Sequence, residues 1–514
     1  MSTSRVLVVL SLLVILGLPW LYRPKSASHP DNAERLVVIT PNVEHLRIEF
    51  ARGFSEWHEA TYGTPVFVDF RQPGGTSEIR RQLMAQYESA IRRGDIAPDG
   101  SCEVGTMPYD LLFSGGSYEH DQMRSGVTVP IDGRDVSISI SVPASFSQEQ
   151  LDAWFGENVI GSTYLYDPER YWISAALSSF GMLYNRDLLD ELGVEEPTTW
   201  TDLADPKLTG WLGLADPRMS GSVSTTFESI LNNLGWELGW RTLRAMCANA
   251  QYFASSSSKT PLDVSAGESA VGLAIDFYGR YQEQAVREFE GDGTRARLGY
   301  VDPAGQVYID PDQISILRGG PHPEMAHRFI EYVLSDHGQA VWQLPAKGEE
   351  ASWDVLGPRR FELRKLPTRR SMYTDYFDRF IDKVKPFEIA SDAEPSGWRS
   401  MIAPMMGAFA IDIHHDMIVA WEAMHHARLG GVDDGLLDEM DDLFFAMPEH
   451  VFLDDDMRPT GQELPFTEEN YHAIRNDWRN PRKAAEHKIA YTAFFRSNYK
   501  TIVERLESEA LASH

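Results

Sequence analysis

The sequence predicts an α/β fold of two lobes, built from parallel or mixed sheets flanked by helices and followed by a mainly helical C-terminal extension. Two observations support this prediction. Units of strand, small-residue turn and helix follow one another near the start of the chain, and the same unit returns after residue 200. From about Arg369 onward the spacing of the apolar residues becomes helical.

The clearest unit lies at Val66–Leu83. A β-branched and aromatic run, Val66–Phe70, predicts a strand that ends at Pro73-Gly74-Gly75, and a helix begins at Thr76 or Ser77. The start of such a helix presents backbone N–H groups and the positive end of the helix dipole, so it attracts anions. The alternative is that the glycines only make the turn.

Composition limits the kinds of partner. The chain has 514 residues, with 47 lysines and arginines against 76 acidic residues, which gives a net charge of −29. An acidic excess of this size argues against nucleic acid, because phosphates require a basic face. This charge balance suits a soluble protein in a crowded compartment and says little about the fold.

The amino terminus resembles a targeting segment. Residues 1–28 contain Arg5, the short apolar run Val6–Leu18 and the small residues Ser26-Ala27-Ser28. This pattern predicts a secretory signal peptide and hence a periplasmic or extracytoplasmic protein. An uncleaved signal anchor is the alternative, and it would tether the protein to the membrane.

Two further strands in the first lobe end at polar turns. Arg35–Thr40 is followed by Pro41-Asn42, and Asp110–Phe113 is followed by a Ser-Gly-Gly turn. Ligands bind beyond the carboxyl ends of the strands in parallel sheets, so we expect the three turns to share one ligand site. The first-lobe residues assigned to this site are Thr40, Asn42, Gly74, Gly75, Thr76, Ser77, Ser114, Gly115 and Gly116.

The second lobe repeats the arrangement. The strand Leu208–Ala215 runs into a small-residue turn and a helix at Thr225–Leu234. The buried strand Val271–Ile275 ends at Asp276 and Tyr278, which could contact a ligand. A serine-rich loop lies between these two units. The second-lobe residues assigned to the ligand site are Ser220, Gly221, Ser222, Ser257, Ser258, Lys259, Asp276 and Tyr278.

The order of these elements predicts that the second lobe is inserted into the first. A strand at Phe180–Asn185 leaves the first lobe, and a strand at Ile309–Leu317 with a helix at Pro323–Leu334 returns to it. The predicted division is residues 34–178 and 305–372 for lobe 1, 179–304 for lobe 2 and 373–514 for the extension.

Within the extension, one helix is expected over about Met401–Leu429 and another from Asn480-Pro481. Residues 433–456 are rich in acidic side chains and contain no lysine or arginine, which predicts a solvated loop or a partly disordered segment. Cys102 and Cys247 fall in different lobes and are expected to be separate thiols.

Motifs for catalysis or for metal binding are absent from the sequence. No G-x-S-x-G, Walker A, H-E-x-x-H or C-x-x-C pattern occurs. The pairs His414-His415 and His425-His426 are about 16 Å apart along a helix, which is too far to chelate one ion. The sequence thus predicts no metal, no cofactor and no catalytic residue.

Seven segments together resemble the type 2 periplasmic, or extracellular, solute-binding proteins of ABC importers, family 1, in the iron(III)-binding-like branch. They are LVVITPN, PGGTSEI, DLLFSGG, SFGMLYNRDLL, DPKLTGWLGLADPRMSGS, GESAVGLAIDFYG and PEMAHRFIEYVLS, and they cover roughly residues 34–372. The resemblance implies a periplasmic-binding-protein type 2 fold whose lobes close over a small ligand, and an ABC permease as the partner. The extension departs from compact members of the family.

The resemblance also bears on the ligand. Iron binders of the family have two adjacent tyrosines, whereas this chain has Tyr278-Gly279, so one phenolate is missing. If iron were the ligand, the family positions would be His45, Glu78 and Tyr278. The glycine and hydroxyl turns fit an anionic or hydroxylated solute better, with Lys259 or Arg218 as a counter-charge.

Two other classes of function stay open. An enzyme could have kept the two-lobed fold with Asp276 as a catalytic acid, although no nucleophile and base pair is recognisable in the sequence. A sensor or scaffold could use residues 373–514 to contact partners. The prediction favoured here is a binding protein without enzymatic activity.

Overall fold

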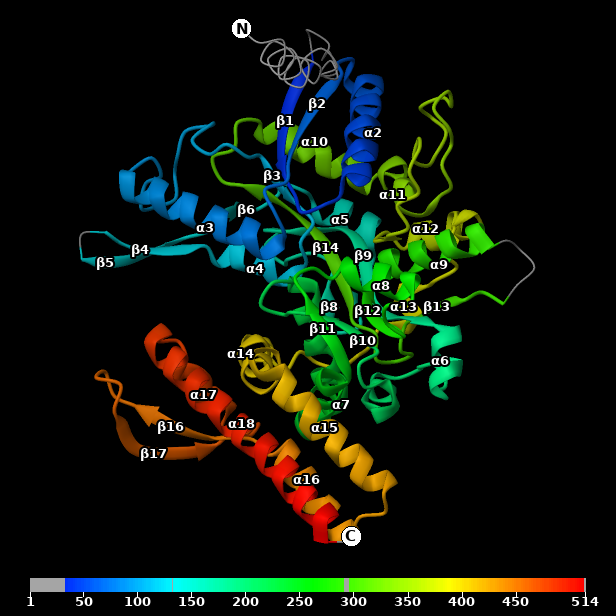
Figure 1. The fold of residues 1–514 in the computed structure, drawn as a ribbon. Helices are drawn as coiled ribbons and strands as arrows, with labels where there is room; N and C mark the ends of the chain where they lie inside the picture. Colours follow the sequence, from blue (N-terminus) through cyan, green and yellow to red (C-terminus); the bar gives the residue numbers. More distant parts are fainter. Residues whose placement is uncertain (1–32, 132, 291–294, 513–514) are drawn as a thin grey trace, which may run out of the picture.

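The computed structural model of the chain describes residues 33–131, 133–290 and 295–512. The signal peptide or anchor expected at residues 1–28 lies outside the described residues. One mixed sheet runs through the molecule with strand order β11-β10-β12-β9-β14-β3-β1-β2, and helices cover it (Figure 1). The predicted α/β class is confirmed. None of the described helices is long and apolar enough to cross a membrane.

The first half of the sheet is formed by the three strands expected near the start of the chain. Strand β1 (Glu34–Ile39) pairs in parallel with β2 (Val66–Arg71) and with β3 (Leu111–Phe113). The helices that follow them are α2 (Glu44–Tyr62), α3 (Thr76–Arg93) and α4 (Ser117–Ser125). Apolar residues such as Leu36, Phe50 and Phe113 form the core between these layers.

The second half is built in the same way. Strand β10 (Leu212–Ala215) pairs in parallel with β11 (Ala250–Ala254) and β12 (Val271–Ile275). The helices here are α7 (Gly221–Asn249), α8 (Lys259–Ala266) and α9 (Asp276–Glu290). The helix predicted at Thr225–Leu234 is the first part of α7, which is interrupted at Gly235, where φ is 75°.

Two long strands join the halves. Strand β9 (Ile173–Asn185) is buried at every position and is longer than the predicted Phe180–Asn185. Its residues Ile173–Ser179 pair with β14 (Ile309–Leu317), and Phe180–Tyr184 pair with β12. The partner of β9 thus changes at the point where the sequence places the border between the lobes, while the lobe boundaries themselves stay a prediction.

Shorter elements complete this part of the chain. The hairpin β4–β5 projects from the first half in Figure 1, and β13 pairs with the second half of β9. The bounds are β4 (Val127–Ile131), β5 (Arg134–Ile138), β6 (Ser141–Val142), α5 (Gln148–Phe155), β7 (Val159–Ile160), β8 (Thr163–Tyr164), α6 (Arg186–Leu192), η1 (Trp200–Ala204), η2 (Pro206–Leu208), β13 (Leu298–Val301), α10 (Pro323–Leu334), α11 (Asp336–Gln343), β15 (Leu366–Pro367), α12 (Ser371–Asp375), η3 (Phe377–Arg379) and α13 (Pro386–Ile389).

The extension is mainly helical, as predicted, but two expectations within it are wrong. The single helix expected at Met401–Leu429 is two helices, because the chain leaves helical geometry at Ala410. The acidic residues 433–456 are not a solvated loop but form helix α16 and strand β16. The bounds are α14 (Arg399–Phe409), η4 (Ile411–Ile413), α15 (His414–Leu429), α16 (Asp434–Phe445), β16 (Glu449–Leu453), β17 (Pro459–Pro465), α17 (Tyr471–Asp477) and α18 (Pro481–Ala512).

Helix α16 forms because apolar residues occur at helical spacing among the acids. Leu437, Met440 and Phe444 are buried, and the acidic residues lie on the other side of the helix. Asp433 caps the helix by accepting a hydrogen bond from the N–H of Leu436.

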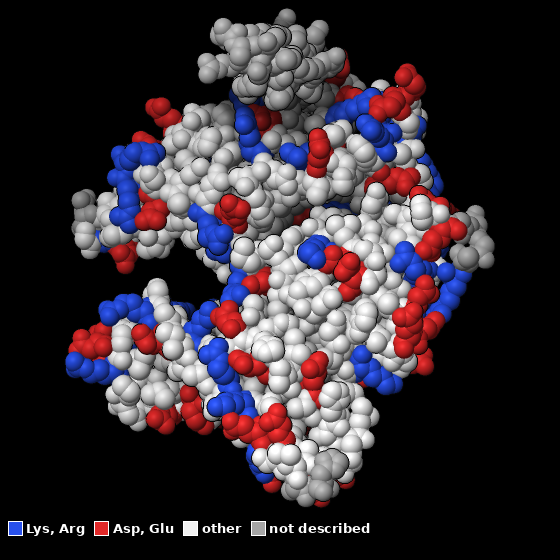
Figure 2. Space-filling model, viewed as in Figure 1, with Lys and Arg blue, Asp and Glu red and all other residues white. Residues whose placement is uncertain are grey.

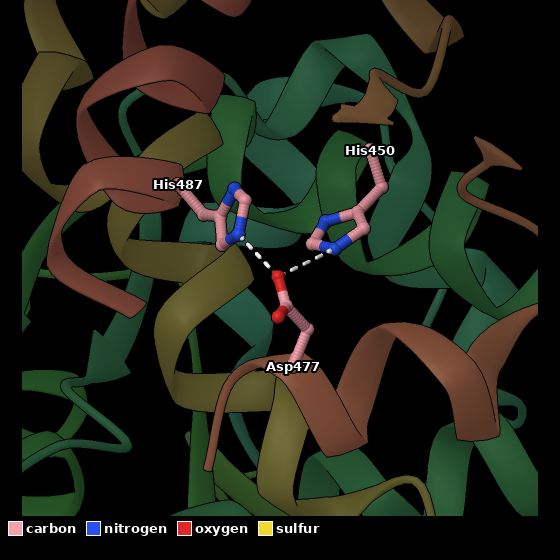
Figure 3. Close-up of side chains that lie close together, drawn as sticks. All are labelled: His450, Asp477 and His487. Carbon is pink, nitrogen blue, oxygen red and sulfur yellow. Dashed lines mark hydrogen bonds and ion pairs between the residues drawn. The ribbon is translucent and has the colours of Figure 1, made fainter. Parts of the chain in front are cut away.

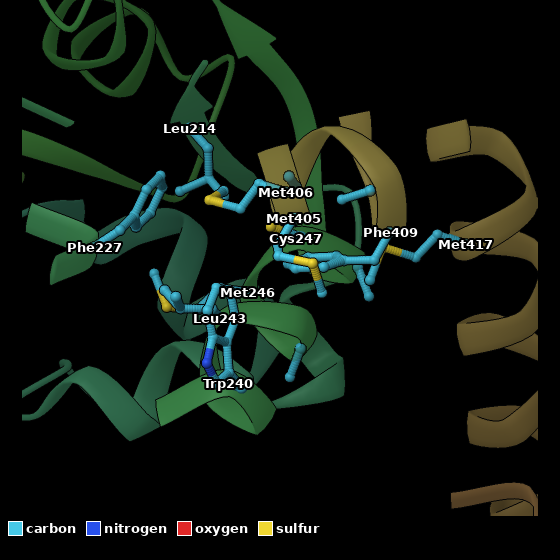
Figure 4. Packing of buried hydrophobic residues seen from close by; sticks show 14 of the residues in the cluster. Leu214, Phe227, Trp240, Leu243, Met246, Cys247, Met405, Met406, Phe409 and Met417 are labelled. Atoms are coloured by element: carbon cyan, nitrogen blue, oxygen red, sulfur yellow. The ribbon is translucent and has the colours of Figure 1, made fainter. Parts of the chain in front are cut away.

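The extension shares a hydrophobic core with the second half of the sheet. Helix α14 packs on α7, and the ring centroids of Trp240 and Phe409 lie 6.2 Å apart (Figure 4). The ring of Trp398, just before α14, has its centroid 5.2 Å from that of Trp236. Cys247 is buried in this core, and both it and Cys102 are free thiols, as expected. The extension is thus part of one packed unit with the second half.

We expect Phe409→Ala to destabilise this unit by about 3–5 kcal/mol, because the fully buried ring would leave a cavity between α7, α14 and α18. Denaturant unfolding followed by tryptophan fluorescence measures the loss. Phe289→Ala is the control, since that side chain is 92% exposed and its removal should leave stability unchanged. Equal stability of the two variants would contradict a shared core.

Candidate functional site

A cavity of about 520 Å³ lies at the carboxyl ends of the central strands, between the two halves of the sheet. Ser178 and Phe180 of β9 and Asp310 and Asp312 of β14 contribute to its lining, so the cavity lies where the halves join. The structure brings most of the predicted site residues to it. These are Asn42, Gly74, Gly75, Thr76, Ser77, Ser114, Gly115, Gly116, Ser220, Gly221, Ser222, Ser257, Ser258 and Tyr278.

Four helices begin at the cavity. The residues that precede α3, α4, α7 and α8 are Gly75, Gly116, Ser220 and Ser258, and all of them line it. The first N–H groups of a helix have no acceptor within the helix and carry the positive end of the dipole. The cavity is therefore surrounded by backbone donors suited to an anion or to hydroxyl oxygens.

Local hydrogen bonds fix the turns after β1 and β3. Ser114 has a positive φ of 69°, which is uncommon for a residue other than glycine. Its hydroxyl accepts a hydrogen bond from the side-chain amide of Asn42 at 2.7 Å, and its N–H donates to the carbonyl of Gln313 at 2.7 Å. These contacts hold the two turns beside each other.

The two sides of the cavity touch at one edge. A Cβ atom added to Gly221, at the start of α7, would lie 2.9 Å from the hydroxyl of Thr76, at the start of α3. At Gly75 an added Cβ would meet nothing within 4 Å, so this residue borders open space. The lack of a side chain at Gly221 thus permits the close approach of the two helix starts.

Three cationic side chains that were not predicted from the sequence line the cavity. They are Arg81, Lys365 and Arg399. Lys365 is buried, forms an ion pair with Asp312 and lies 4.9 Å from the centre of the Phe277 ring. Arg81 lies four residues after Ser77 in α3, so helical spacing from that predicted site residue could have indicated it.

Arg399 comes from the extension. Its guanidinium donates hydrogen bonds to the hydroxyl of Thr225 at 2.7 Å and to the carbonyl of Gly221 at 3.0 Å, and it pairs with Glu228 at 3.2 Å. It also lies 4.6 Å from the centre of the Tyr118 ring, across the cavity. The extension thereby contributes one cation directly to the candidate site.

Acidic side chains also reach the cavity. Asp310 accepts hydrogen bonds from the hydroxyl and the N–H of Ser117 at 2.5 and 3.3 Å, yet burial raises the pKa of its carboxyl to about 7. Burial also raises the pKa of Glu119, against the lowering influence of Arg399 and Arg80. Protonated carboxyls would leave more positive potential in the cavity than the formal charges suggest.

Three of the predicted ligand residues lie elsewhere. Thr40 is fully buried, and its hydroxyl accepts a hydrogen bond from the N–H of Asn42, so it stabilises the turn beneath the cavity. The ammonium of Lys259 pairs with Asp263 one helical turn later and does not point into the cavity. Asp276 is fully buried, lies 3.5 Å from Arg280 and is not part of the cavity lining.

The ligand set considered for iron is not assembled. Glu78 and Tyr278 line the cavity, but His45 does not, and its ring lies 5.8 Å from that of Phe361. Burial raises the pKa of Tyr278 to about 12. Arg218, considered as a counter-charge, instead pairs with Asp216 and with Asp412 of the extension.

The pKa of Asp310 predicts a pH dependence of stability. With a usual value near 3.8 and a folded value of about 7, the folded protein binds more protons than the unfolded chain between these pH values. The extra proton on Asp310 therefore favours the folded state at low pH, and this part of the stability is lost as the pH rises from about 4 to 7. We expect Asp310→Asn to remove that part of the decline in unfolding experiments across this range, and identical pH profiles for the two proteins would contradict it.

Comparison with known proteins identifies part of the chain. Residues 144–346 match the family model described as bacterial extracellular solute-binding protein. The phosphoglycerate transport regulatory protein PgtC of Salmonella typhimurium is 28% identical over 169 residues, which are 33% of this chain and 40% of that protein. An uncharacterized protein of Haemophilus influenzae is 26% identical over 172 residues, 33% of this chain and 47% of that protein. The chain thus spans less than half the length of these curated relatives.

Solved structures of low sequence identity also align with the chain. The periplasmic binding protein AfuA from Actinobacillus pleuropneumoniae, with fructose-6-phosphate bound, is 18% identical at a TM-score of 0.48 and covers 74% of this chain and 99% of its own. Iron-bound HitA from Pseudomonas aeruginosa is 17% identical at a TM-score of 0.44, and the alignment covers 72% of this chain and 99% of HitA. The match over residues 144–346 makes this part of the chain similar to the bacterial extracellular solute-binding proteins.

Proposed function

We propose that this protein captures a small anionic solute that also carries hydroxyl groups, such as a sugar phosphate or a phosphorylated acid, and delivers it to an ABC permease. The observation that carries the proposal is the convergence of four helix starts and three cationic side chains on one cavity. Helix starts and guanidinium groups are the usual donors to phosphate and carboxylate oxygens.

The other lining groups suit the hydroxyl part of such a solute. Serine hydroxyls of the loop Ser255–Ser258 and the carboxyls of Glu78, Asp310 and Asp312 can accept or donate hydrogen bonds. A volume of about 520 Å³ falls in the range of pockets for small metabolites, which is about 300–1,000 Å³. The name of one relative, phosphoglycerate transport regulatory protein, is consistent with this class of ligand.

Ferric iron is the alternative ligand. Tyr278 and Glu78 could supply two oxygen donors, but a second tyrosine beside Tyr278 is not accommodated here. A Cβ atom added to Gly279 would lie 2.3 Å from the ring of Tyr300, so a side chain cannot be placed there without rearrangement. These contacts favour the anion over the metal.

The two remaining classes of function have less support. For an enzyme, the candidate acid Asp276 would have to reach the ligand, but it is buried outside the cavity lining. For a scaffold, the extension would act apart from the cavity, whereas Arg399 of the extension lines it. The extension is therefore included in the binding unit proposed here.

A ligand panel tests the proposal. We expect fructose 6-phosphate or 3-phosphoglycerate to raise the melting temperature, because a ligand that binds only the folded state stabilises it. Fructose without phosphate should have little effect, and ferric citrate should produce no visible absorption band. A strong band that disappears in Tyr278→Phe would restore iron, and stabilisation by fructose equal to that by its phosphate would exclude anion recognition.

Arg399→Met should weaken binding of the stabilising anion by roughly 10- to 150-fold, because a hydrogen bond to a charged group contributes about 1.5–3 kcal/mol. Isothermal titration calorimetry measures the affinity. Lys259→Met is the matched control, because it removes one positive charge from an exposed side chain outside the cavity.

Arg399 also pairs with the largely buried Glu228, so Arg399→Met is combined with Glu228→Gln to avoid an unpaired charge. Unchanged affinity in this double variant, with the thermal unfolding of the ligand-free protein preserved, would place the anion elsewhere.

A further inference from the structure

The extension contains a second cluster of chemically active side chains, separate from the cavity lining. His450 of β16, Asp477 at the end of α17 and His487 of α18 each offer one atom within 4.8 Å of the others (Figure 3). The Nε2 atom of His487 lies 2.8 Å from Oδ2 of Asp477, and Nε2 of His450 lies 3.3 Å from the same oxygen. Three segments of the chain thus direct their donor atoms to one point.

The cluster is withdrawn from solvent. The side chain of His450 is fully buried, and those of His487 and Asp477 are 4% and 7% exposed. Buried polar atoms are normally hydrogen-bonded, but Nε2 of His450 has no hydrogen-bond partner among the described residues. An unpartnered imidazole nitrogen facing a carboxylate oxygen is explained if both are ligands of a cation.

Neighbouring groups orient the donors. Nδ1 of His450 is hydrogen-bonded to the hydroxyl of Tyr491 at 2.7 Å, and in the tautomer whose Nδ1–H donates this bond the lone pair of Nε2 is available to a metal. The ammonium of Lys483 binds Oδ1 of Asp477 at 2.9 Å, so Oδ2 is turned toward the imidazoles. Outer partners of this kind are usual around metal ligands, since they fix tautomer and orientation.

We propose that His450, Asp477 and His487 bind a divalent transition-metal ion of the zinc class. Two imidazoles and one carboxylate match the ligand preferences of Zn²⁺ and leave a fourth position for water. The positive charge of Lys483 opposes the ion, which limits the affinity without changing the donor set. The metal would join the β16–β17 hairpin to α17 and α18, and this inference does not rest on the proposed solute.

Zinc titration of the chelator-treated full-length chain tests the site. We expect one equivalent of Zn²⁺ to bind and to raise the melting temperature. Asp477→Asn and His487→Gln should each lower the affinity by more than about 100-fold, because loss of an outer partner alone costs about 10- to 100-fold. His472→Gln is the control, since His472 is an exposed histidine on the same helix as Asp477 and should change nothing.

Two measurements keep the test informative if a variant folds poorly. Co²⁺ added to the unaltered protein should give the intense visible bands of a four-coordinate site, and an excess of Zn²⁺ should abolish them. Lys483→Met should strengthen zinc binding, because it removes the opposing charge. Zinc affinity that is equal in the control and in both ligand variants, or a pale six-coordinate cobalt spectrum, would overturn the proposal.

Discussion

The continuous burial of β9 is the constraint on which both halves of the sheet depend. One main chain supplies hydrogen bonds to β14 through Ile173–Ser179 and to β12 through Phe180–Tyr184. A buried backbone group without its partner costs roughly 1–3 kcal/mol, so neither half can separate from β9. Relative movement of the halves is therefore limited to bending or twisting of β9 and β14. Because Ser178 and Asp310 lie at this junction and line the cavity, such bending would change the cavity directly.

The extension also contributes to this cavity, through Arg399 at the start of α14. Its helix α14 packs on α7, and the shared core fixes α14 so that Arg399 reaches the start of α7. Buried Arg244 of α7 strengthens this junction, because its guanidinium donates hydrogen bonds to the carbonyls of Phe444 and Ala446 at the end of α16. Charges on the surface drawn in Figure 2 are mixed, with lysine and arginine beside aspartate and glutamate rather than in one basic patch. The concentrated donors of this molecule therefore lie in the cavity rather than on that face.

The sequence predicted the parts of the cavity that depend on local structure. A strand that ends at Gly74-Gly75 and a helix that starts at Thr76 are defined by neighbouring residues, so their positions were correct. Lys259 was assigned to the ligand site because it lies at the start of α8, which the sequence indicates. The sequence does not show that its ammonium pairs with Asp263 instead. Lys365 and Arg399 were missed because only tertiary packing brings them to the cavity. In residues 433–456 the acidic composition hid the apolar spacing of α16.

Two of the three cations of the cavity are compensated before any ligand enters. Lys365 pairs with Asp312 and Arg399 with Glu228, so an anion would share these cations with buried carboxyls rather than meet free positive charge. Burial raises the pKa of Asp310, so a negative charge on this carboxyl of the cavity is disfavoured. The start of α4 is compensated in the same way, because the N–H of Ser117 donates a hydrogen bond to Asp310 and the N–H of Gly115 in the preceding turn donates one to Asp312. Selectivity for an anion would therefore depend first on the starts of α3, α7 and α8, and the paired cations would adjust its strength.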